Sequence, residues 1–242
     1  MINQKQKIIE AYRDKETTET FDKDRGEYAY QKYKHKIEAN FLKKTIKSTE
    51  KNKIKILDVA CGTGRMLPEV FSAGKKIEYF GLDTSREMLK ILLEKSKKMN
   101  LKNKIKIGDA SKIPFKDNEF DVVFSYHLLW HLPEDEQKRI IKEMLRVCKK
   151  EGFVIFDILN RNFILEKFKA VIGKEKREGI YKLSINNTKK ILGIADNRID
   201  IEKILDAPIK NSLIYRLFNI INNLRKILPQ SLYHMIYLRV KK

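Results

Sequence analysis

The stretch Ile54-Lys55-Ile56-Leu57-Asp58-Val59-Ala60-Cys61-Gly62-Thr63-Gly64 decides how the rest of this 242-residue sequence is interpreted. Its first six residues favour a β-strand, and the glycines that follow let a strand-to-helix loop approach a ligand closely. Leu67 stands where a dinucleotide-binding loop has its third glycine, and no glycine is followed by Lys-Ser or Lys-Thr at P-loop spacing. The loop therefore predicts a ligand that needs no pyrophosphate cradle.

Working outward, β-rich segments alternate with helical patterns. The further strands are expected at residues 77–82, 105–107, 121–125 and 153–158, and residues 234–240 alternate as a last, antiparallel strand would. This alternation predicts an open α/β sheet, in which ligands bind at the carboxyl ends of the strands. Each of the first five strands ends in a polar residue, in chain order Asp58, Asp83, Asp109, Ser125 and Asp157. The binding site is expected along that edge.

Two of these carboxylates have the spacing of a nucleoside site. Asp83 lies 21 residues after Gly62, where a carboxylate accepts hydrogen bonds from ribose hydroxyls. Asp109 ends the next strand and can accept a hydrogen bond from an exocyclic amine such as that of adenine. A glycine loop, a ribose acceptor and an adenine acceptor without phosphate-binding residues indicate an adenosine cofactor that lacks phosphate, of which S-adenosylmethionine is the common example.

Several motifs in register resemble the class I S-adenosylmethionine-dependent methyltransferases, in their small-molecule branch. The resemblance covers residues 54–158, through the segments 56–64, 81–89, 108–115, 120–125, 129–132 and 145–152. It implies a Rossmann-like, doubly wound, mostly parallel seven-stranded sheet and transfer of a methyl group to an O, N or C atom, with S-adenosylhomocysteine (SAH) as product. The sequence departs from the family pattern at Ala60, where a glycine is usual, and at residues 149–151, where Lys-Lys-Glu replaces Lys-Pro-Gly.

The resemblance also implies roles for individual residues. Asp58 reaches the methionine amino group, Asp83 holds the ribose and Asp109 contacts the adenine amine. The full set of expected cofactor-binding residues is Tyr28, Asp58, Ala60, Gly62, Gly64, Asp83, Thr84, Met88, Asp109, Ala110 and Ser125. Tyr28 belongs to this set because the N-terminal helices often cover the cofactor in this family, although core packing explains that tyrosine equally well.

His127 and His131 follow the fourth strand, where the methyl acceptor is expected. Their spacing of four residues would put both on one helical face, but no Glu or Cys accompanies them at ligand spacing, so no metal site is predicted. A general base that takes a proton from the acceptor is the better functional reading for either histidine. The alternative mechanism is catalysis by positioning of the two reactants alone, without a base. A purely structural role, local packing of the histidine rings, is the remaining interpretation.

The sequence is expected to form a single domain over residues 1–242. Residues 1–48 read as an N-terminal helical lid, residues 54–158 as the cofactor-binding core, and residues 160–242 as a substrate-side segment that closes the sheet. That last segment contains a C-terminal helical insertion, residues 211–228, with one apolar face and one basic face.

The net charge and the cysteine content bear on the location of the protein and on its alternative functions. Lys and Arg number 52 against 32 Asp and Glu, which gives a net charge of +20, while the two cysteines cannot form a disulfide framework. With no signal peptide and no apolar run of membrane-spanning length, the expected location is the cytoplasm, peripheral to a membrane if the basic helix binds anionic lipid. A small-molecule acceptor is favoured. An RNA (tRNA) methyltransferase and a non-catalytic S-adenosylmethionine-binding protein remain the rivals, and the oligomeric state stays open.

Overall fold

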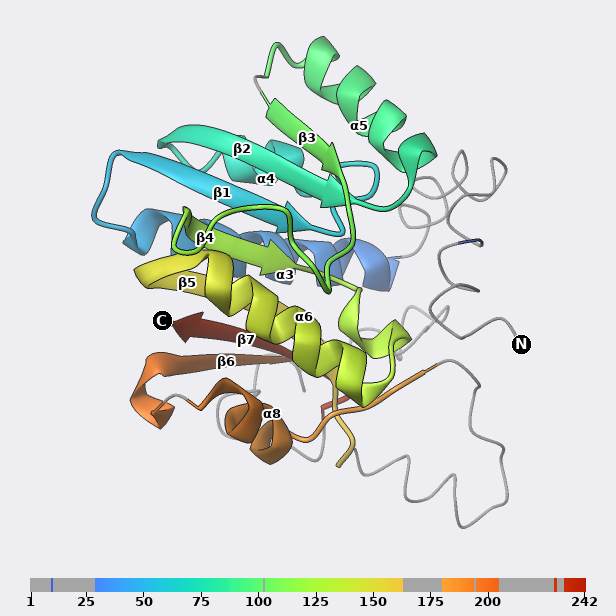
Figure 1. Cartoon of the computed structure of the whole chain (residues 1–242), viewed down its shortest axis with the longest axis vertical. Coiled ribbons are helices and arrows are strands. Elements are labelled where there is room, and N and C mark those ends of the chain that lie inside the picture. Colours follow the sequence, from blue (N-terminus) through green and yellow to red (C-terminus); the bar gives the residue numbers. More distant parts are fainter. Residues whose placement is uncertain are drawn as a thin grey trace.

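The computed structural model describes residues 10, 29–101, 103–162, 180–193, 195–204, 229 and 233–242. Within them, seven strands form one sheet in the order β3-β2-β1-β4-β5-β7-β6 (Figure 1). Their bounds are β1 Lys53–Val59, β2 Lys76–Asp83, β3 Asn103–Ile107, β4 Phe120–Ser125, β5 Cys148–Leu159, β6 Ile199–Ile204 and β7 Met235–Lys241. The first five strands pair in parallel, whereas β7 runs antiparallel to both β5 and β6. The expected mostly parallel, seven-stranded α/β sheet is confirmed.

Helices cover both faces of this sheet. The helices are α3 Ala29–Ser48, α4 Leu67–Phe71, α5 Arg86–Lys98, α6 Glu134–Val147 and α8 Ile185–Leu192, with short 3-10 turns η1 Leu129–His131 and η2 Asp196–Arg198. Figure 1 shows α6 and α8 in front of the sheet and α3 and α4 behind it. The sheet is therefore a middle layer, and its central strands are buried on both sides. The side chains of β4 illustrate this, because all six are buried.

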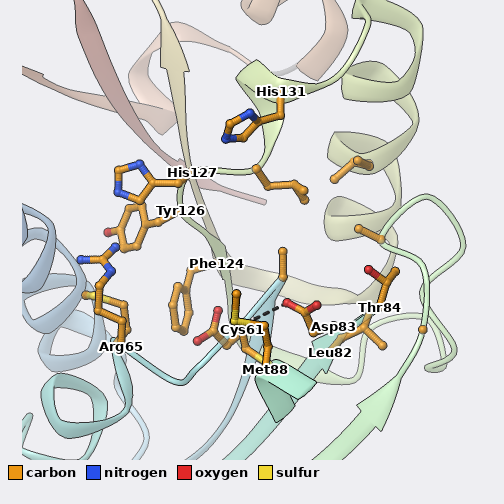
Figure 2. Close-up of a pocket in the computed structure, with 18 of the residues that line it drawn as sticks. Cys61, Arg65, Leu82, Asp83, Thr84, Met88, Phe124, Tyr126, His127 and His131 are labelled. Atoms are coloured by element: carbon orange, nitrogen blue, oxygen red, sulfur yellow. Dashed lines mark hydrogen bonds between the residues drawn. The ribbon is translucent and has the colours of Figure 1, made fainter. Parts of the chain in front are cut away.

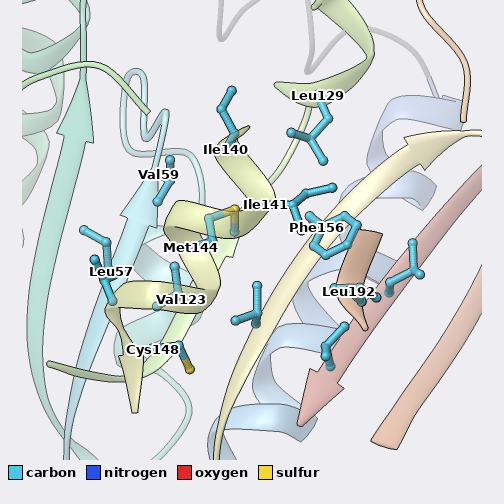
Figure 3. Close-up of a cluster of buried hydrophobic side chains, with 14 of the residues drawn as sticks. Leu57, Val59, Val123, Leu129, Ile140, Ile141, Met144, Cys148, Phe156 and Leu192 are labelled. Carbon is cyan, nitrogen blue, oxygen red and sulfur yellow. The ribbon is translucent and has the colours of Figure 1, made fainter. Parts of the chain in front are cut away.

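Alternate residues of each strand supply two hydrophobic cores. On the α6 side, Leu57, Val123 and Phe156 pack against Ile141 and Met144 of α6 (Figure 3). On the α3 side, Ile56, Val122 and Ile155, each the chain neighbour of a residue in the first core, pack against apolar residues of α3 and α4. The period-2 alternation of side chains along a strand thus fixes which helix each residue meets.

The structure agrees with most of the expected elements. Ser85 caps α5, because its side chain accepts a hydrogen bond from the Met88 N–H, and the N-terminal helix ends at Ser48 as expected. The strand expected at residues 153–158 begins earlier, at Cys148, and Glu151 within it adopts a φ of +63°. Strand β6 and helix α8 were not predicted from the sequence. The helical insertion at residues 211–228 and most of the N-terminal lid lie outside the described residues.

In the part of the chain that the structure describes, no helix combines the length and the apolar character needed to cross a membrane.

Candidate functional site

A pocket opens at the carboxyl ends of β1, β2 and β4, where the sequence places its site (Figure 2). It encloses about 1120 Å³ of space, its open mouth included. Of the sequence-predicted residues, the pocket brings together Asp58, Ala60, Gly62, Asp83, Thr84, Met88, Asp109, Ala110, His127 and His131.

The glycine loop after β1 takes a left-handed backbone that suits a bound ligand. The φ angles are +58° at Ala60, +52° at Gly62 and +74° at Gly64. A Cβ built on Gly62 would meet nothing within 4 Å, whereas one on Gly64 would lie 2.8 Å from Leu92 Cγ. Gly62 therefore keeps a ligand approach open, and Gly64 lets α5 pack closely. Ala60 adopts the backbone that a glycine adopts more easily, which explains why glycine is usual there.

Asp83 joins the two loops that frame the pocket. Its Oδ2 accepts a hydrogen bond of 2.8 Å from the Gly62 N–H, and its Oδ1 accepts one of 2.9 Å from the Ser85 N–H. Burial raises the pKa of this carboxyl, and the two backbone N–H groups partly oppose that rise. The carboxylate is thus fixed at the end of β2, with further lone pairs that can accept hydrogen bonds from a ligand.

Asp58 is a buried carboxyl at the end of β1. The Tyr79 hydroxyl donates a hydrogen bond of 2.8 Å to its Oδ2. Burial raises the pKa of Asp58 to about 8, although the Tyr79 hydroxyl and the Arg65 guanidinium act in the opposite direction. A pKa of about 8 favours the protonated form at neutral pH, and a cation beside this carboxyl would favour the ionised form instead.

The other expected cofactor-binding residues have different positions. Asp109 is half-buried, and its Oδ1 accepts hydrogen bonds from the backbone N–H and the hydroxyl of Ser111, at 2.8 and 2.9 Å. Gly64 and Ser125 are buried and do not line the pocket in the described residues. Tyr28 lies outside the described residues.

His131 and His127 both line the pocket but have different surroundings. His131 ends the η1 turn, and its ring stacks on Trp130 with centroids 3.8 Å apart. His127 precedes that turn with a φ of +64°, and residues 127–131 form no α-helix, so the two rings do not share a helical face. The His127 N–H donates a hydrogen bond of 2.8 Å to Asp157 Oδ1.

A cluster of charged and hydroxyl groups lies behind His127, and we name it the Glu38 cluster. Glu38 of α3 is fully buried; its Oε1 lies 2.8 Å from His127 Nε2 and its Oε2 lies 2.6 Å from an Arg65 terminal nitrogen. The Tyr237 hydroxyl donates a hydrogen bond of 2.9 Å to Glu38 Oε1. The cluster consists of Glu38, Arg65, His127, Asp157 and Tyr237.

The titration behaviour of the two carboxyls in this cluster differs. Burial would raise the pKa of Glu38, but the positive charges of Arg65 and His127 outweigh it and hold the pKa well below its usual range. Burial raises the pKa of Asp157 to about 7, and the negative charge of Glu38 adds to the rise. Glu38 is therefore the permanently ionised member of the pair.

Sequence reasoning missed Glu38, Arg65 and Tyr126 as site residues. Arg65 had a usable signal, because it directly follows the glycine loop. Tyr126 likewise follows the fourth strand. Glu38 had none, because its partners His127 and Tyr237 lie 89 and 199 residues further along the chain.

Comparison with known proteins gives one family and several relatives. A family model described as a methyltransferase domain matches residues 57–156. An uncharacterized protein of Methanocaldococcus jannaschii is 32% identical over 173 residues, which are 72% of this chain and 60% of that protein. A phosphatidylethanolamine N-methyltransferase of Cereibacter sphaeroides is 37% identical over 103 residues, 42% of this chain and 48% of that enzyme. The chain thus spans about half to three-fifths of the length of these relatives.

Among solved structures, the magnesium protoporphyrin IX methyltransferase of Synechocystis, crystallised with SAH, has the same fold. The two structures superpose with a TM-score of 0.66 at 15% sequence identity, and the aligned region covers 98% of this chain and 100% of the Synechocystis chain. At that identity the likeness concerns the fold, including the sheet whose carboxyl edge forms the pocket.

Proposed function

We propose that the chain is a class I S-adenosylmethionine-dependent methyltransferase and that it transfers the methyl group of that cofactor to an O, N or C atom of a small acceptor. The methyltransferase family model over residues 57–156 and the shared fold support this proposal. We further propose that the acceptor is amphipathic or lipid-linked. The observation that carries the proposal is the convergence of Asp58, Asp83 and Asp109 on one pocket beside an open glycine loop.

The pocket residues fit the cofactor group by group. Gly62 leaves free the space that a Cβ would fill, so the loop accommodates a ligand at close range. Asp83 is fixed by two backbone N–H groups and offers its remaining lone pairs to ribose hydroxyls. We propose that Asp58 receives the methionine ammonium and that Asp109 receives the adenine amine. When bound, the cofactor supplies a methyl group already activated on a sulfonium.

For the chain itself, the chemistry is mainly positioning. The acceptor atom must lie in line with the bond that breaks, and holding both reactants in one pocket supplies most of the advantage. Where the acceptor carries a proton, we propose His131 as the group that removes it, because its ring lines the pocket and packs against Trp130 at an interplanar angle of 31°. His127 is less suited to that task, because it already pairs with Glu38.

An amphipathic acceptor is supported by the apolar lining of the pocket and by one relative. Besides the histidines, the pocket is lined by Phe124, Leu128, Leu132 and Ile140, which suit an apolar molecule. The relative at 37% identity is named for methylation of phosphatidylethanolamine, a lipid. Peripheral contact with an anionic membrane would bring such an acceptor to the pocket.

The net charge of +20 favours a second candidate, an RNA methyltransferase. Of the seven basic residues between positions 210 and 242, the three that the structure describes have local partners. Arg239 pairs with Asp200, Lys241 with Glu151, and the Lys242 ammonium donates to the Cys148 carbonyl. The charges of Arg239 and Lys241 are therefore partly neutralised on the protein, and the Lys242 ammonium is engaged locally, which makes the RNA function the weaker candidate.

The test is transfer of label from S-adenosylmethionine carrying a radioactive methyl group. The protein is incubated with a cell extract, which is then separated into lipid, RNA, protein and small-molecule fractions. Label in the lipid or small-molecule fraction is the expected result, and label in the RNA fraction would establish the second candidate. Binding of the cofactor without label in any fraction would leave a non-catalytic binding protein. Co-sedimentation with anionic vesicles, in competition with tRNA at one ionic strength, tests the membrane contact separately.

A further inference from the structure

The Glu38 cluster connects the N-terminal helix α3 with one side of the pocket. Three residues on that side, Arg65, Tyr126 and His127, each contact Glu38. Two of them pair with its carboxylate, and the Tyr126 hydroxyl donates a hydrogen bond of 3.2 Å to its backbone carbonyl. Figure 2 shows these three side chains together, with Asp83 and Thr84 on the other side of the pocket. One residue of α3 thus holds the part of the pocket that faces away from the expected nucleoside.

The burial of the Glu38 carboxylate does not by itself require two cationic partners. A buried carboxylate needs a partner, and Arg65 at 2.6 Å already supplies an ion pair. The His127 imidazole at 2.8 Å is a second, additional cation-forming partner. Its presence brings a titratable group to the pocket beside a carboxylate that stays ionised.

The backbone of His127 is held as tightly as its ring. A φ of +64° is unusual for a residue other than glycine and strains the backbone. Asp157 fixes this conformation by accepting the His127 N–H at 2.8 Å, and its Oδ2 accepts the Trp130 indole N–H at 3.2 Å. Backbone strain that is held by the surroundings in this way concentrates at functional sites.

We propose that Glu38 is a positioning residue, which orients the His127 imidazole on the acceptor side of the pocket and sets the pH at which that ring loses its proton. This deepens the proposed function and rests on it, because the acceptor side belongs to the same pocket. The consequence is that α3 determines the charge presented to the acceptor, in addition to covering the sheet.

Every charged or titratable group around His127 enters this balance. These groups are Glu38 and the buried Lys34 on α3, Arg65 in the loop after β1, Asp157 on β5, Tyr237 on β7, and Tyr126 and His131 in the segment after β4. Among them, the Glu38 carboxylate lies closest to a ring nitrogen, because Asp157 Oδ2 stands 3.8 Å from His127 Nδ1. Removal of the Glu38 charge is therefore expected to change the proton affinity of His127 most.

The single tryptophan of the chain provides a readout that needs no acceptor. The Trp130 and His127 rings meet edge to face with centroids 6.2 Å apart. A protonated imidazole quenches indole fluorescence more strongly than a neutral one, so the Trp130 emission follows the proton on a neighbouring histidine. The experiment is a pH titration of this emission in the full chain.

We expect Glu38→Gln to lower the midpoint of the titration by about 1–3 pH units, the effect of removing an adjacent opposite charge. Glu69→Gln is the matched control, because Glu69 pairs with His35 and Lys43 of α3 but does not line the pocket. It should leave the midpoint unchanged. His127→Asn, which tolerates the left-handed backbone, should abolish the transition that depends on Glu38, and His131→Gln should retain it.

An unchanged midpoint in folded Glu38→Gln, or a Glu38-dependent transition that persists in His127→Asn, would overturn the proposal. Should Glu38→Gln fail to fold, Glu38→Met/Arg65→Met replaces the ion pair by apolar chains of similar length. The midpoint should again fall, but by less than in Glu38→Gln, because the repelling charge of Arg65 is lost together with the Glu38 carboxylate. In the methyl-transfer assay the pH profile of turnover of Glu38→Gln should shift to lower pH. The affinity of this variant for SAH should change less than its turnover does. If no extract fraction is labelled, the proposed function fails while the fluorescence titration still decides the role of Glu38.

Discussion

Cofactor binding should release a proton from Asp58. The pKa of this carboxyl is about 8 in the free protein, where burial is the largest cause. A methionine ammonium beside it favours the ionised form, so the complex contains the carboxylate. Between pH 5.5 and 7 the α-amino group, with a pKa of about 7.7–8.0, is already protonated and does not interfere. In this range each pH unit removes about 1.4 kcal/mol of the cost of deprotonating Asp58.

The expected affinity therefore rises about 30-fold, or about 2 kcal/mol, from pH 5.5 to pH 7. Isothermal titration calorimetry of SAH binding at several pH values measures the slope, and two buffers of different ionisation enthalpy measure the protons released. At pH 6 about one proton should leave per SAH bound. Asp58→Asn, which cannot titrate, should lose that proton release and the corresponding part of the slope.

The same pKa predicts a trend in the stability of the free protein. Because the folded pKa of Asp58 exceeds the unfolded value of 3.8, the folded state binds more protons between about pH 4 and pH 8, and its stability falls as the pH rises through that window. Asp58→Asn should therefore gain stability relative to the wild type as the pH increases. An affinity that stays flat between pH 5.5 and 7, or equal slopes in wild type and Asp58→Asn, would refute the reasoning.

Three further substitutions separate binding from folding. Asp83→Asn should abolish most SAH binding in calorimetry while the circular dichroism spectrum stays native, and wild-type affinity would contradict the role of Asp83. Gly64→Ala should destabilise the fold by about 2–5 kcal/mol in urea unfolding, because a left-handed backbone costs about 1–2 kcal/mol and overpacking against Leu92 about 1–3 kcal/mol. Gly62→Ala shares the backbone cost of about 1–2 kcal/mol but not the contact with Leu92, and it should also lose SAH affinity. Phe156→Ala should cost about 3–5 kcal/mol of stability with little change in SAH affinity, since Phe156 is fully buried in the α6-side core.

The cofactor side of the site could be predicted from the sequence because its signals are local. A strand, a glycine loop and a carboxylate at the next strand end recur at short spacing, and Gly62 and Asp83 are indeed joined by a hydrogen bond. The five parallel strands could be predicted for the same reason. Burial on both faces makes the central strands β1, β4 and β5 short apolar runs between helical patterns.

The acceptor side could not be predicted in the same way, because long-range packing creates it. Glu38 reads as an ordinary charge on a helix until β7 brings Tyr237 against it. Strand β6 was missed because Ile199–Ile204 alternates apolar and charged residues at the edge of the sheet, a weak pattern in a chain with 35% charged residues. Backbone strain was equally invisible, since His127 and Glu151 carry side chains that seldom adopt a positive φ.

The position of β7 has a consequence for how the chain reaches its native state. Although β7 follows every other strand in the sequence, it lies between β5 and β6, and its antiparallel partners are Phe153–Leu159 on one side and β6 on the other. Until β7 has been synthesised, β6 has no neighbour in the sheet and β5 presents an open edge, which is the kind of surface on which nascent chains aggregate. Folding of this half is therefore a slow, high-contact-order step that follows the β1–β5 half, and on a ribosome it begins only when β7 has left the exit tunnel.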